Sequence, residues 1–348
     1  MAAIMPTLLS GIACGARQGI LLKDGAQLET LARVKAIAFD KTGTLTTGVL
    51  QVSDQVSASG IEASQVLQVA ASLEAYSEHP IAEAIVTEAQ RQELSLLPVT
   101  AVQAEVGQGI VGEWAGTPIR VGKPQFAIAN SLQEPDSPLL QISHQLEAAG
   151  KTVIGVVKHQ HWLGLLAVAA QVRPQAVQVL ATLKQRGIAT VMLTGDHAAT
   201  AQSLAQNVGI QAVYSDLLPE DKVKVVRELQ QQYGTVAMVG DGINDAPALA
   251  QASVGIAMGG IGSDVALETA DVVLMGDRLE KLIQAIEIGA KSQRIIRQNI
   301  VLALASISLL MLANFFGELT LPAGVLGHEG STLLVTLNGL RLLRSDRT

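Results

Sequence analysis

The sequence predicts an α/β fold, in which a mostly parallel sheet is interrupted by an inserted domain and followed by membrane-spanning helices. Short β-branched runs alternate with helical patterns such as residues 175–186 and 222–232, and this alternation indicates a parallel sheet. Three of the apolar runs lead directly into a segment that carries an aspartate. Two long apolar runs near the carboxyl end are each long enough to cross a bilayer.

Composition limits the possible classes of protein. The 348 residues suffice for two or three domains, and a content of 49% hydrophobic, 3% aromatic and 16% charged residues is too apolar for disorder. It is also somewhat apolar for a wholly soluble protein, so a membrane portion is expected. A net charge of −7 without a dense basic patch argues against nucleic acid as a partner. The single cysteine, Cys14, excludes an intrachain disulfide and fits a reducing compartment.

The first segment has the wrong charge order for a signal peptide. No charge occurs before Arg17, whereas a signal peptide places positive charge ahead of its apolar run. We therefore expect residues 1–20 to be the end of a transmembrane helix and a linker.

Three predicted strands bring carboxylates to one edge of the sheet. Residues 34–39 lead into Asp40, residues 189–193 into Thr194-Gly195-Asp196, and residues 236–239 into Gly240-Asp241. Open α/β sheets hold their ligands at the carboxyl ends of the strands. This edge is the candidate functional site.

A second domain separates the first of these strands from the others. Residues 49–162 have their own strand and helix pattern with Gly-rich turns, which is typical of an insertion. The sheet domain is then predicted to comprise residues 21–48 and 163–290.

The carboxyl-terminal runs, residues 300–317 and 319–340, predict a transmembrane hairpin over residues 299–341. Lys281, Lys291, Arg294 and Arg297 precede the pair, and Arg341, Arg344 and Arg347 follow it. Because positive charge marks the cytosolic side, both ends and the catalytic domains are expected to be cytosolic in a multi-pass membrane protein. The alternative is a pair of buried core helices.

The segment Asp40-Lys41-Thr42-Gly43-Thr44-Leu45-Thr46 carries the most specific chemistry. An aspartate directly after a strand can attack a phosphoryl group and form an acyl phosphate. The threonine hydroxyls, the lysine and the turn amides can hold phosphoryl oxygens, and Mg²⁺ offsets the negative charge. A lone aspartate at a strand end is usually structural, so the whole string carries the prediction.

This segment resembles the phosphorylation signature of P-type ATPases, whose core belongs to the haloacid dehalogenase superfamily. Three further matches follow in the expected order: Thr194-Gly195-Asp196, Pro219-Glu220-Asp221-Lys222, and Gly240-Asp241-Gly242-Ile243-Asn244-Asp245-Ala246-Pro247. The resemblance implies a haloacid-dehalogenase-like phosphorylation domain with an inserted α+β nucleotide-binding domain, and ATP and Mg²⁺ as cofactors. In isolation, Gly-Asp-Gly is also an ordinary turn signal.

The resemblance assigns a role to each motif. Thr194 would donate its hydroxyl to the transferred phosphoryl group, and Lys222 would place a fixed positive charge beside it. The Mg²⁺ ligands implied are Asp40, Asp241 and the backbone carbonyl of Thr42, with Asn244 and Asp245 in support.

The inserted region resembles the nucleotide-binding domain of heavy-metal P-type ATPases through Ser77-Glu78-His79-Pro80 and Gly107-Gln108-Gly109. The likeness implies that Glu74 and His79 contact adenine and that the nucleotide passes close to Gly107, Gly109, Gly122 and Lys123. A lone His-Pro pair is more often a helix start.

The transported ion is expected to depend on His328-Glu329-Gly330-Ser331-Thr332. Ionisable residues at membrane depth are usually functional, and imidazole with carboxylate suits Zn²⁺ or Co²⁺ better than Cu⁺. The string resembles the last-helix motif of the cobalt/zinc-type subgroup, so His328, Glu329 and Thr332 are candidate ligands. Alternatively, His328 and Glu329 cap a helix at the interface.

The chain departs from the family pattern in two ways. The Cys-Pro-type metal motif and the actuator domain are missing, so we expect the carboxyl-terminal half of a pump, through fragmentation, a split gene or a shortened sequence. The missing amino-terminal half is a candidate partner. Ala170 stands where the family usually has an aspartate before Arg173-Pro174, which leads to the hypothesis of impaired turnover.

The expected function is ATP-dependent transport of a divalent heavy-metal cation through an aspartyl phosphate on Asp40. One alternative is a free-standing phosphatase of the same superfamily. Such enzymes usually carry a general acid two residues after the nucleophile, where Thr42 stands here. The other alternative is an inactive membrane fragment.

Overall fold

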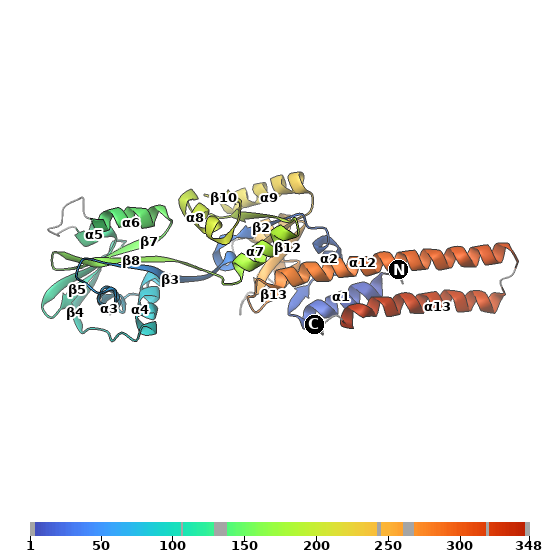
Figure 1. Cartoon of the computed structure of the whole chain (residues 1–348), viewed down its shortest axis with the longest axis horizontal. Coiled ribbons are helices and arrows are strands. Elements are labelled where there is room, and N and C mark those ends of the chain that lie inside the picture. Colours follow the sequence, from blue (N-terminus) through green and yellow to red (C-terminus); the bar gives the residue numbers. More distant parts are fainter. Residues whose placement is uncertain are drawn as a thin grey trace. The chain divides into compact units, whose positions relative to one another are not determined.

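The computed structural model describes residues 4–105, 107–128, 138–241, 245–259, 268–317 and 320–344 (Figure 1). The chain divides into two compact units. Unit 1 comprises Met1–Leu45, Pro174–Gly195 and Ala205–Thr348, and unit 2 comprises Thr46–Arg173 and Asp196–Leu204. The predicted limits of the inserted domain, 49 and 162, fall inside two paired strands, β3 (Thr46–Ser57) and β8 (His161–Val172), which both belong to unit 2.

Unit 1 is built on a seven-stranded sheet in the order β1-β13-β12-β11-β2-β9-β10. Every neighbouring pair is parallel except β1 with β13, so the predicted parallel sheet is confirmed with one antiparallel edge strand. The strands are β1 (Ile20–Leu22), β2 (Ala36–Asp40), β9 (Ala189–Leu193), β10 (Ala212–Tyr214), β11 (Val236–Gly240), β12 (Val254–Gly259) and β13 (Val272–Met275).

The central strands are apolar, apart from Asp40 at the end of β2, because both faces of the sheet are covered. Every residue of β2, β11 and β12 is buried, as expected for a parallel sheet between helical layers. The strand predicted from residue 34 begins at Ala36, because the backbone N–H of Val34 still donates to the carbonyl of Leu31 in the turn after α2.

The helices of unit 1 follow the predicted alternation with the strands. The patterns at 175–186 and 222–232 correspond to α7 and α9. Within the described residues, the helices before the hairpin are α1 (Met5–Arg17), α2 (Ala26–Leu31), α7 (Ala176–Gln185), α9 (Pro219–Tyr233) and α10 (Ala246–Gln251), and α8 (Ala198–Val208) is divided between the units.

The carboxyl-terminal hairpin consists of α12 (Lys281–Phe315) and α13 (Leu321–Leu340), which contact each other and run side by side (Figure 1). α12 is continuous over 35 residues and crosses both predicted boundaries, 290 and 299. Among the described residues it is the one helix long and apolar enough to span a bilayer, with a mean hydropathy of 1.9 in its apolar part. The second predicted span forms a helix, but Gly327, His328 and Glu329 reduce its apolar character.

A polar network joins α1 to both helices of the hairpin. Asn299 and Thr7 are fully buried. The Asn299 side-chain amide donates to Thr7 Oγ1 over 3.2 Å, and that of Asn338 donates to Asn299 Oδ1 over 2.8 Å. Gly339 allows this approach, since a Cβ there would lie 2.9 Å from Thr7 Oγ1. The network fixes α1, α12 and α13 to one another.

Unit 2 contains a six-stranded antiparallel sheet in the order β3-β8-β7-β6-β5-β4. Alternate residues of its strands face opposite sides. Ile154 belongs to the cluster that includes α3 and α4, whereas the neighbouring Val153 belongs to the cluster that includes α5 and α6. The remaining elements are α3 (Ala63–Glu74), α4 (Pro80–Arg91), β4 (Val99–Glu105), β5 (Gly109–Trp114), β6 (Thr117–Gly122), α5 (Pro124–Ile128), α6 (Pro138–Ala148) and β7 (Thr152–Lys158).

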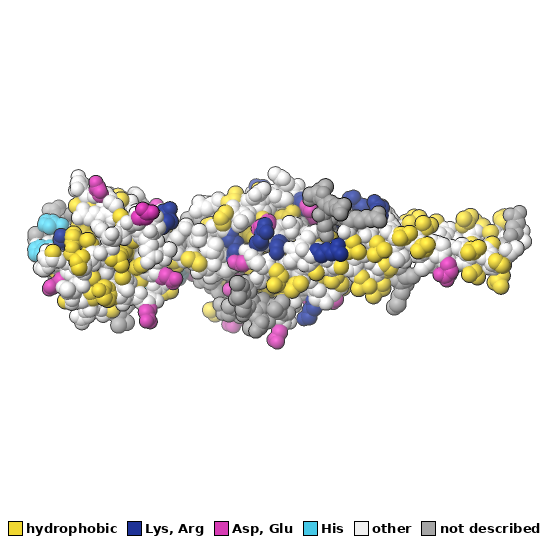
Figure 2. All heavy atoms as spheres, turned by 90° about the horizontal axis from the view of Figure 1, so that it is seen from below, with side chains coloured by type: hydrophobic (Ala, Val, Ile, Leu, Met, Phe, Trp, Pro, Cys, Tyr) yellow, Lys and Arg dark blue, Asp and Glu magenta, His cyan; other side chains and the backbone are white. Residues whose placement is uncertain are grey.

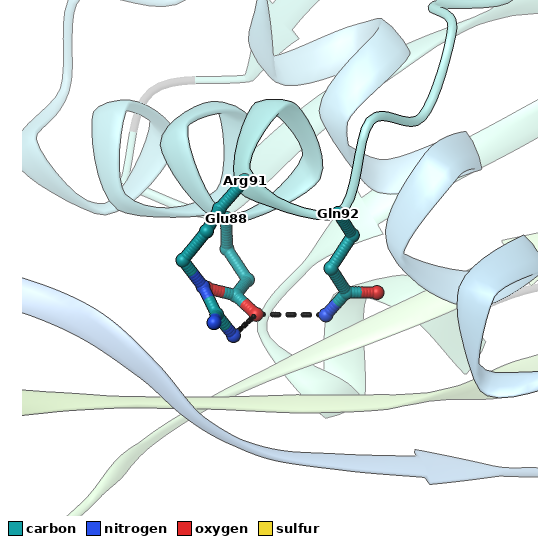
Figure 3. A network of polar contacts seen from close by, with 3 residues as sticks. All are labelled: Glu88, Arg91 and Gln92. Carbon is teal, nitrogen blue, oxygen red and sulfur yellow. Dashed lines mark hydrogen bonds and ion pairs between the residues drawn. The ribbon is translucent and has the colours of Figure 1, made fainter.

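The last turn of α4 is stabilised by a local carboxylate (Figure 3). Glu88 accepts hydrogen bonds from Arg91 Nε and Nη2, over 2.7 and 2.6 Å, and from Gln92 Nε2 over 2.7 Å. The Arg91 hydrogen bonds hold the pKa of Glu88 below its ordinary value. Spacings of three and four residues place these groups on the same face of the helix end.

Candidate active site

The carboxyl ends of β2, β9 and β11 lie side by side, because β2 pairs with both neighbours. Asp40 ends β2, Thr194 follows β9 and Asp241 follows β11. Asp40 and Thr194 are only 6% and 2% exposed. The predicted strands therefore bring the three motifs to one edge of the sheet.

The turn after Asp40, residues 41–45, is shaped by a glycine. Gly43 has φ +71°, which a side-chain-bearing residue rarely adopts. A Cβ at Gly43 would also lie 3.2 Å from Cβ and Oδ2 of Asp241. The turn thus packs against Asp241, with Thr42 exposed and Thr44 fully buried.

Lys222 connects two buried carboxylates. It lies in the first turn of α9, where Pro219 and a hydrogen bond of 3.3 Å from the Leu218 N–H to Asp221 Oδ2 fix the helix start. Its Nζ donates to Asp40 Oδ1 over 2.5 Å and to Asp245 Oδ1 over 2.6 Å. Asp245 is 1% exposed and rests against Gly240, where a Cβ would lie 2.8 Å from Asp245 Oδ2.

The electrostatics of this cluster are dominated by burial. The pKa of Asp40 is raised to about 7, first by burial and then by the charge of Asp245, with a smaller contribution from Asp241 and against the opposing effect of Lys222. Burial also raises the pKa of Asp245. Burial favours the neutral form of Lys222, but the charges of Asp40 and Asp245 prevail and raise its pKa.

The cluster has more carboxyl groups than cationic side chains, which suits a hard cation. Asp40 and Asp245 share the ammonium group of Lys222, and Asp241 adds a third carboxylate at the same edge. In the described part of the chain, no group of three His, Cys, Asp or Glu side chains is close enough to enclose a metal ion. Mg²⁺ typically uses one or two carboxylates, water and substrate phosphate, so the donors fit this ion.

The other predicted catalytic residues differ in their burial. Lys41 is half-buried in the turn, Gly195 is exposed, and Asp196 is half-buried. Their catalytic roles stay predictions. Asn244 and Gly242 lie outside the described residues.

Unit 2 contains a pocket of about 320 Å³. The six residues predicted to bind nucleotide all line it, although they come from α3, α4 and the β4–β6 region: Glu74, His79, Gly107, Gly109, Gly122 and Lys123. Their contact with a nucleotide stays a prediction, but the pocket gathers them as the resemblance implies.

Two glycines allow the strands at the pocket to approach closely. Gly109 on β5 pairs with Gly122 on β6. A Cβ at Gly109 would lie 2.2 Å from the carbonyl oxygen of Val121, and one at Gly122 would lie 2.4 Å from that of Gln108. No side chain fits at either position, so backbone forms this wall.

Glu74 and His79 supply polar groups to the pocket. Glu74 is 8% exposed, and burial raises its pKa to about 7, opposed by a hydrogen bond from Ser77. His79 precedes α4, and its Nδ1 accepts from the N–H of Ile81 over 3.2 Å. This bond leaves Nε2 of a neutral imidazole as the donor.

The apolar part of this pocket, and Thr152 beside it, were not predicted from the sequence. Ile81, Ile110, Thr152 and Ile154 also line it, from α4, β5 and β7. No local motif marks these residues, because Thr152 and Ile154 reach the pocket only through the pairing of β7 with β6.

The predicted transport residues lie on α13. His328 and Glu329 are exposed, and Thr332 is half-buried. Ser331 Oγ and Thr332 Oγ1 donate to the backbone carbonyl of His328 over 2.7 and 3.2 Å. No further His, Cys, Asp or Glu from the described residues completes a metal site with them.

Comparisons with known proteins agree with this geometry. A family model for haloacid dehalogenase-like hydrolases matches residues 34–253. A zinc-transporting ATPase of Bacillus subtilis is 45% identical over 99% of this chain and 53% of its own length. A zinc/cadmium/lead-transporting P-type ATPase of Escherichia coli is 42% identical over 97% of this chain and 45% of its own length.

The structure is similar to a crystal structure of a zinc-transporting PIB-type ATPase in its E2·Pi state. The TM-score is 0.91 at 41% identity, covering 99% of this chain and 56% of the other. The chain therefore spans about half the length of the curated relatives that it matches.

Proposed function

Because the chain belongs to the haloacid dehalogenase-like hydrolases and, within them, to the heavy-metal-transporting P-type ATPases, we propose that it carries the ATP-hydrolysing part of a divalent-metal pump. The observation that best supports this proposal is the contact of Lys222 Nζ with Asp40 Oδ1 over 2.5 Å at the sheet edge. It places a nucleophile and a cation where a phosphoryl group can reach both.

In the proposed reaction, a carboxylate oxygen of Asp40 forms a bond to the γ-phosphorus of ATP. The bond between that phosphorus and the bridging oxygen breaks, and ADP leaves. Lys222 holds positive charge beside the transferred group, and the buried Thr194 hydroxyl can donate to its oxygens. Mg²⁺ held by Asp40, Asp241 and the Thr42 carbonyl would supply further positive charge there.

The pocket of unit 2 is proposed to hold the adenine of the nucleotide. The glycine wall lets backbone approach a flat ring, and the isoleucines give it apolar contacts. The carboxyl group of Glu74 and Nε2–H of His79 can hydrogen-bond the ring edge. ATP bound there would be the phosphoryl donor for Asp40.

Transport itself is proposed from the relatives and from α12 and α13. α12 exposes large apolar side chains from Ile300 to Phe315, and α13 exposes them from Leu321 to Leu340, which suits lipid contact. Two spans with cytosolic ends would make the protein multi-pass. The relatives transport zinc, or zinc, cadmium and lead, and His328 and Glu329 suit Zn²⁺ or Co²⁺. Further metal ligands would come from a segment that corresponds to the part of the relatives outside the matched half.

Phosphorylation is tested with the purified chain, γ-labelled ATP and Mg²⁺. We expect an acid-stable, alkali-labile label that is absent in Asp40→Asn and retained in Asp24→Asn, because Asp24 is exposed and outside the site. Label that persists in Asp40→Asn would refute Asp40 as the nucleophile. Phosphate release from simple esters without ATP would favour the phosphatase, and a folded chain that takes no label would favour the inactive fragment.

A further inference from the structure

An open, basic cavity lies where the hairpin meets the rest of unit 1. Its volume is about 900 Å³, and its lining includes Arg294 and Arg297 of α12 and Arg341 just after α13. All three arginines are exposed. None of the described lining residues is acidic. This concentration of positive charge stands out in a chain whose net charge is −7.

The cavity changes from basic to apolar along one face of α12. Arg294, Arg297 and Val301 are three and four residues apart, which places them on the same side of the helix. Val301 and Leu302 also line the cavity, and they are 65% and 45% exposed. With a rise of about 1.5 Å per residue, Arg297 and Val301 are separated by about 6 Å along the helix axis.

The arginines have hydrogen-bonding capacity for an anion. Arg341 is oriented by a hydrogen bond of 3.0 Å from its Nη1 to Asn338 Oδ1, and Asn338 is itself part of the network that joins the helices. Guanidinium groups bind phosphate with two parallel donors. Three such groups around one cavity repel each other unless an anion lies between them.

The apolar surface beyond the arginines favours a lipid phosphate over a free phosphate as the bound anion. Figure 2 shows hydrophobic side chains along the hairpin, with Lys and Arg gathered where it joins the body of unit 1. A free phosphate has no apolar group that could contact Val301 and Leu302. A phospholipid places its phosphate at such a polar boundary and its acyl chain along the apolar face.

We propose that this cavity binds an anionic phospholipid, with the headgroup phosphate held by Arg294, Arg297 and Arg341 and an acyl chain lying against Val301 and Leu302. The inference rests on the proposed membrane position of α12 and α13. It adds a lipid site on the cytosolic side, between the hairpin and the phosphorylation domain.

The test uses the full chain with Leu302→Trp, reconstituted in phosphatidylcholine vesicles with added brominated lipid. Quenching of the new tryptophan, after subtraction of the unsubstituted chain, reports lipid next to residue 302. We expect brominated phosphatidylglycerol to bind at least tenfold more tightly than brominated phosphatidylcholine. Arg294→Gln and Arg297→Gln should each reduce this preference about fivefold, from about 1 kcal/mol per charge.

Two controls make the result specific. Lys35→Gln with Lys184→Gln removes two exposed charges outside the cavity, and it should leave the preference unchanged. Leu309→Trp, at an exposed position further along α12, should be quenched by both brominated lipids in every variant. That signal shows that the helix is inserted and that the variants are folded.

Four outcomes would overturn the inference. Equal binding of the two lipids, or a preference that survives loss of both arginines, would exclude a headgroup site while leaving the pump proposal intact. Displacement of the lipid by millimolar glycerol phosphate would indicate a site for free anions. Failure to quench Leu309→Trp would refute the membrane position itself, and the proposed transport function with it.

Discussion

Glu74 offers a direct test of the electrostatics in the nucleotide pocket. It ends α3, is 8% exposed, and burial raises its pKa to about 7. Glu74→Gln keeps the size and a hydrogen-bonding group but removes the ionisation. We expect this substitution to abolish a pH dependence of stability that the unsubstituted protein shows.

The size and sign of the effect follow from the pKa values. The folded state holds the proton more tightly, so between the unfolded value of 4.5 and the folded value of about 7 it binds more protons than the unfolded chain. Stability therefore falls as pH rises through this window. The whole shift is worth about 3 kcal/mol, of which about 2.5 kcal/mol develops between pH 5 and pH 8.

Tryptophan fluorescence can report this unit alone. The chain has two tryptophans, Trp114 and Trp162, and both belong to unit 2. Urea unfolding of the full chain at pH 5 and pH 8 should show the unsubstituted protein losing about 2.5 kcal/mol more than Glu74→Gln. The matched control is Glu88→Gln, because the pKa of Glu88 is lowered rather than raised and its loss cannot reproduce this slope.

A clear result would refute the reasoning. If Glu74→Gln and the unsubstituted protein lose the same stability between the two pH values, Glu74 is ionised in the folded protein at pH 5. Burial would then not control its charge, and the pocket would be wetter than its geometry indicates.

Three other substitutions test the close strand approach at the pocket, the buried ion pairs of Lys222 and the polar network between the helices. Gly109→Ala should lower the unfolding midpoint of unit 2 by more than Gly116→Ala, because its Cβ would meet the Val121 carbonyl oxygen at 2.2 Å, whereas Gly116 has open space and only the conformational cost of its φ of +73°; equal effects would contradict the close strand approach. Lys222→Met should abolish the phosphoenzyme and cost about 3 kcal/mol or more at pH 8 by calorimetry, since it leaves two buried carboxylates without their cation; an unchanged Tm would contradict this. Asn299→Leu should lower thermal stability in detergent by about 1 kcal/mol through the lost bonds to Thr7 and Asn338, and a stabilised variant would show that the network is not required.

Much of the fold could be predicted from local sequence patterns. The alternation of β-branched runs and amphipathic segments predicted the parallel sheet, and the runs before Asp40, Thr194 and Asp241 identified its central strands. The antiparallel edge strand β1 was not predicted. Its three residues, Ile20–Leu22, have no recognisable period, and only their pairing with β13 makes them a strand.

The candidate sites show the same limit. Motif residues such as Asp40 and Gly109 could be identified because each motif is short and local. The direct contact of Lys222 with Asp245 was not foreseen, since a separation of 23 residues carries no geometry. The continuity of α12 was also missed, because the change from charged to apolar residues near position 298 was interpreted as a boundary, while no proline or glycine breaks the helix there.

The unbroken course of α12 has a mechanical consequence. Over 35 residues and about 50 Å, the helix has no flexible joint at which its cytosolic and apolar segments could turn independently. At its start, Lys281 Nζ donates to the backbone carbonyl of Met275 over 2.5 Å, which ties the helix to the end of β13. A rotation of the end of β13 would therefore tilt the far end of α12, as in a lever. A glycine pair inserted near position 300 would uncouple the movement of the apolar segment from that of the cytosolic segment.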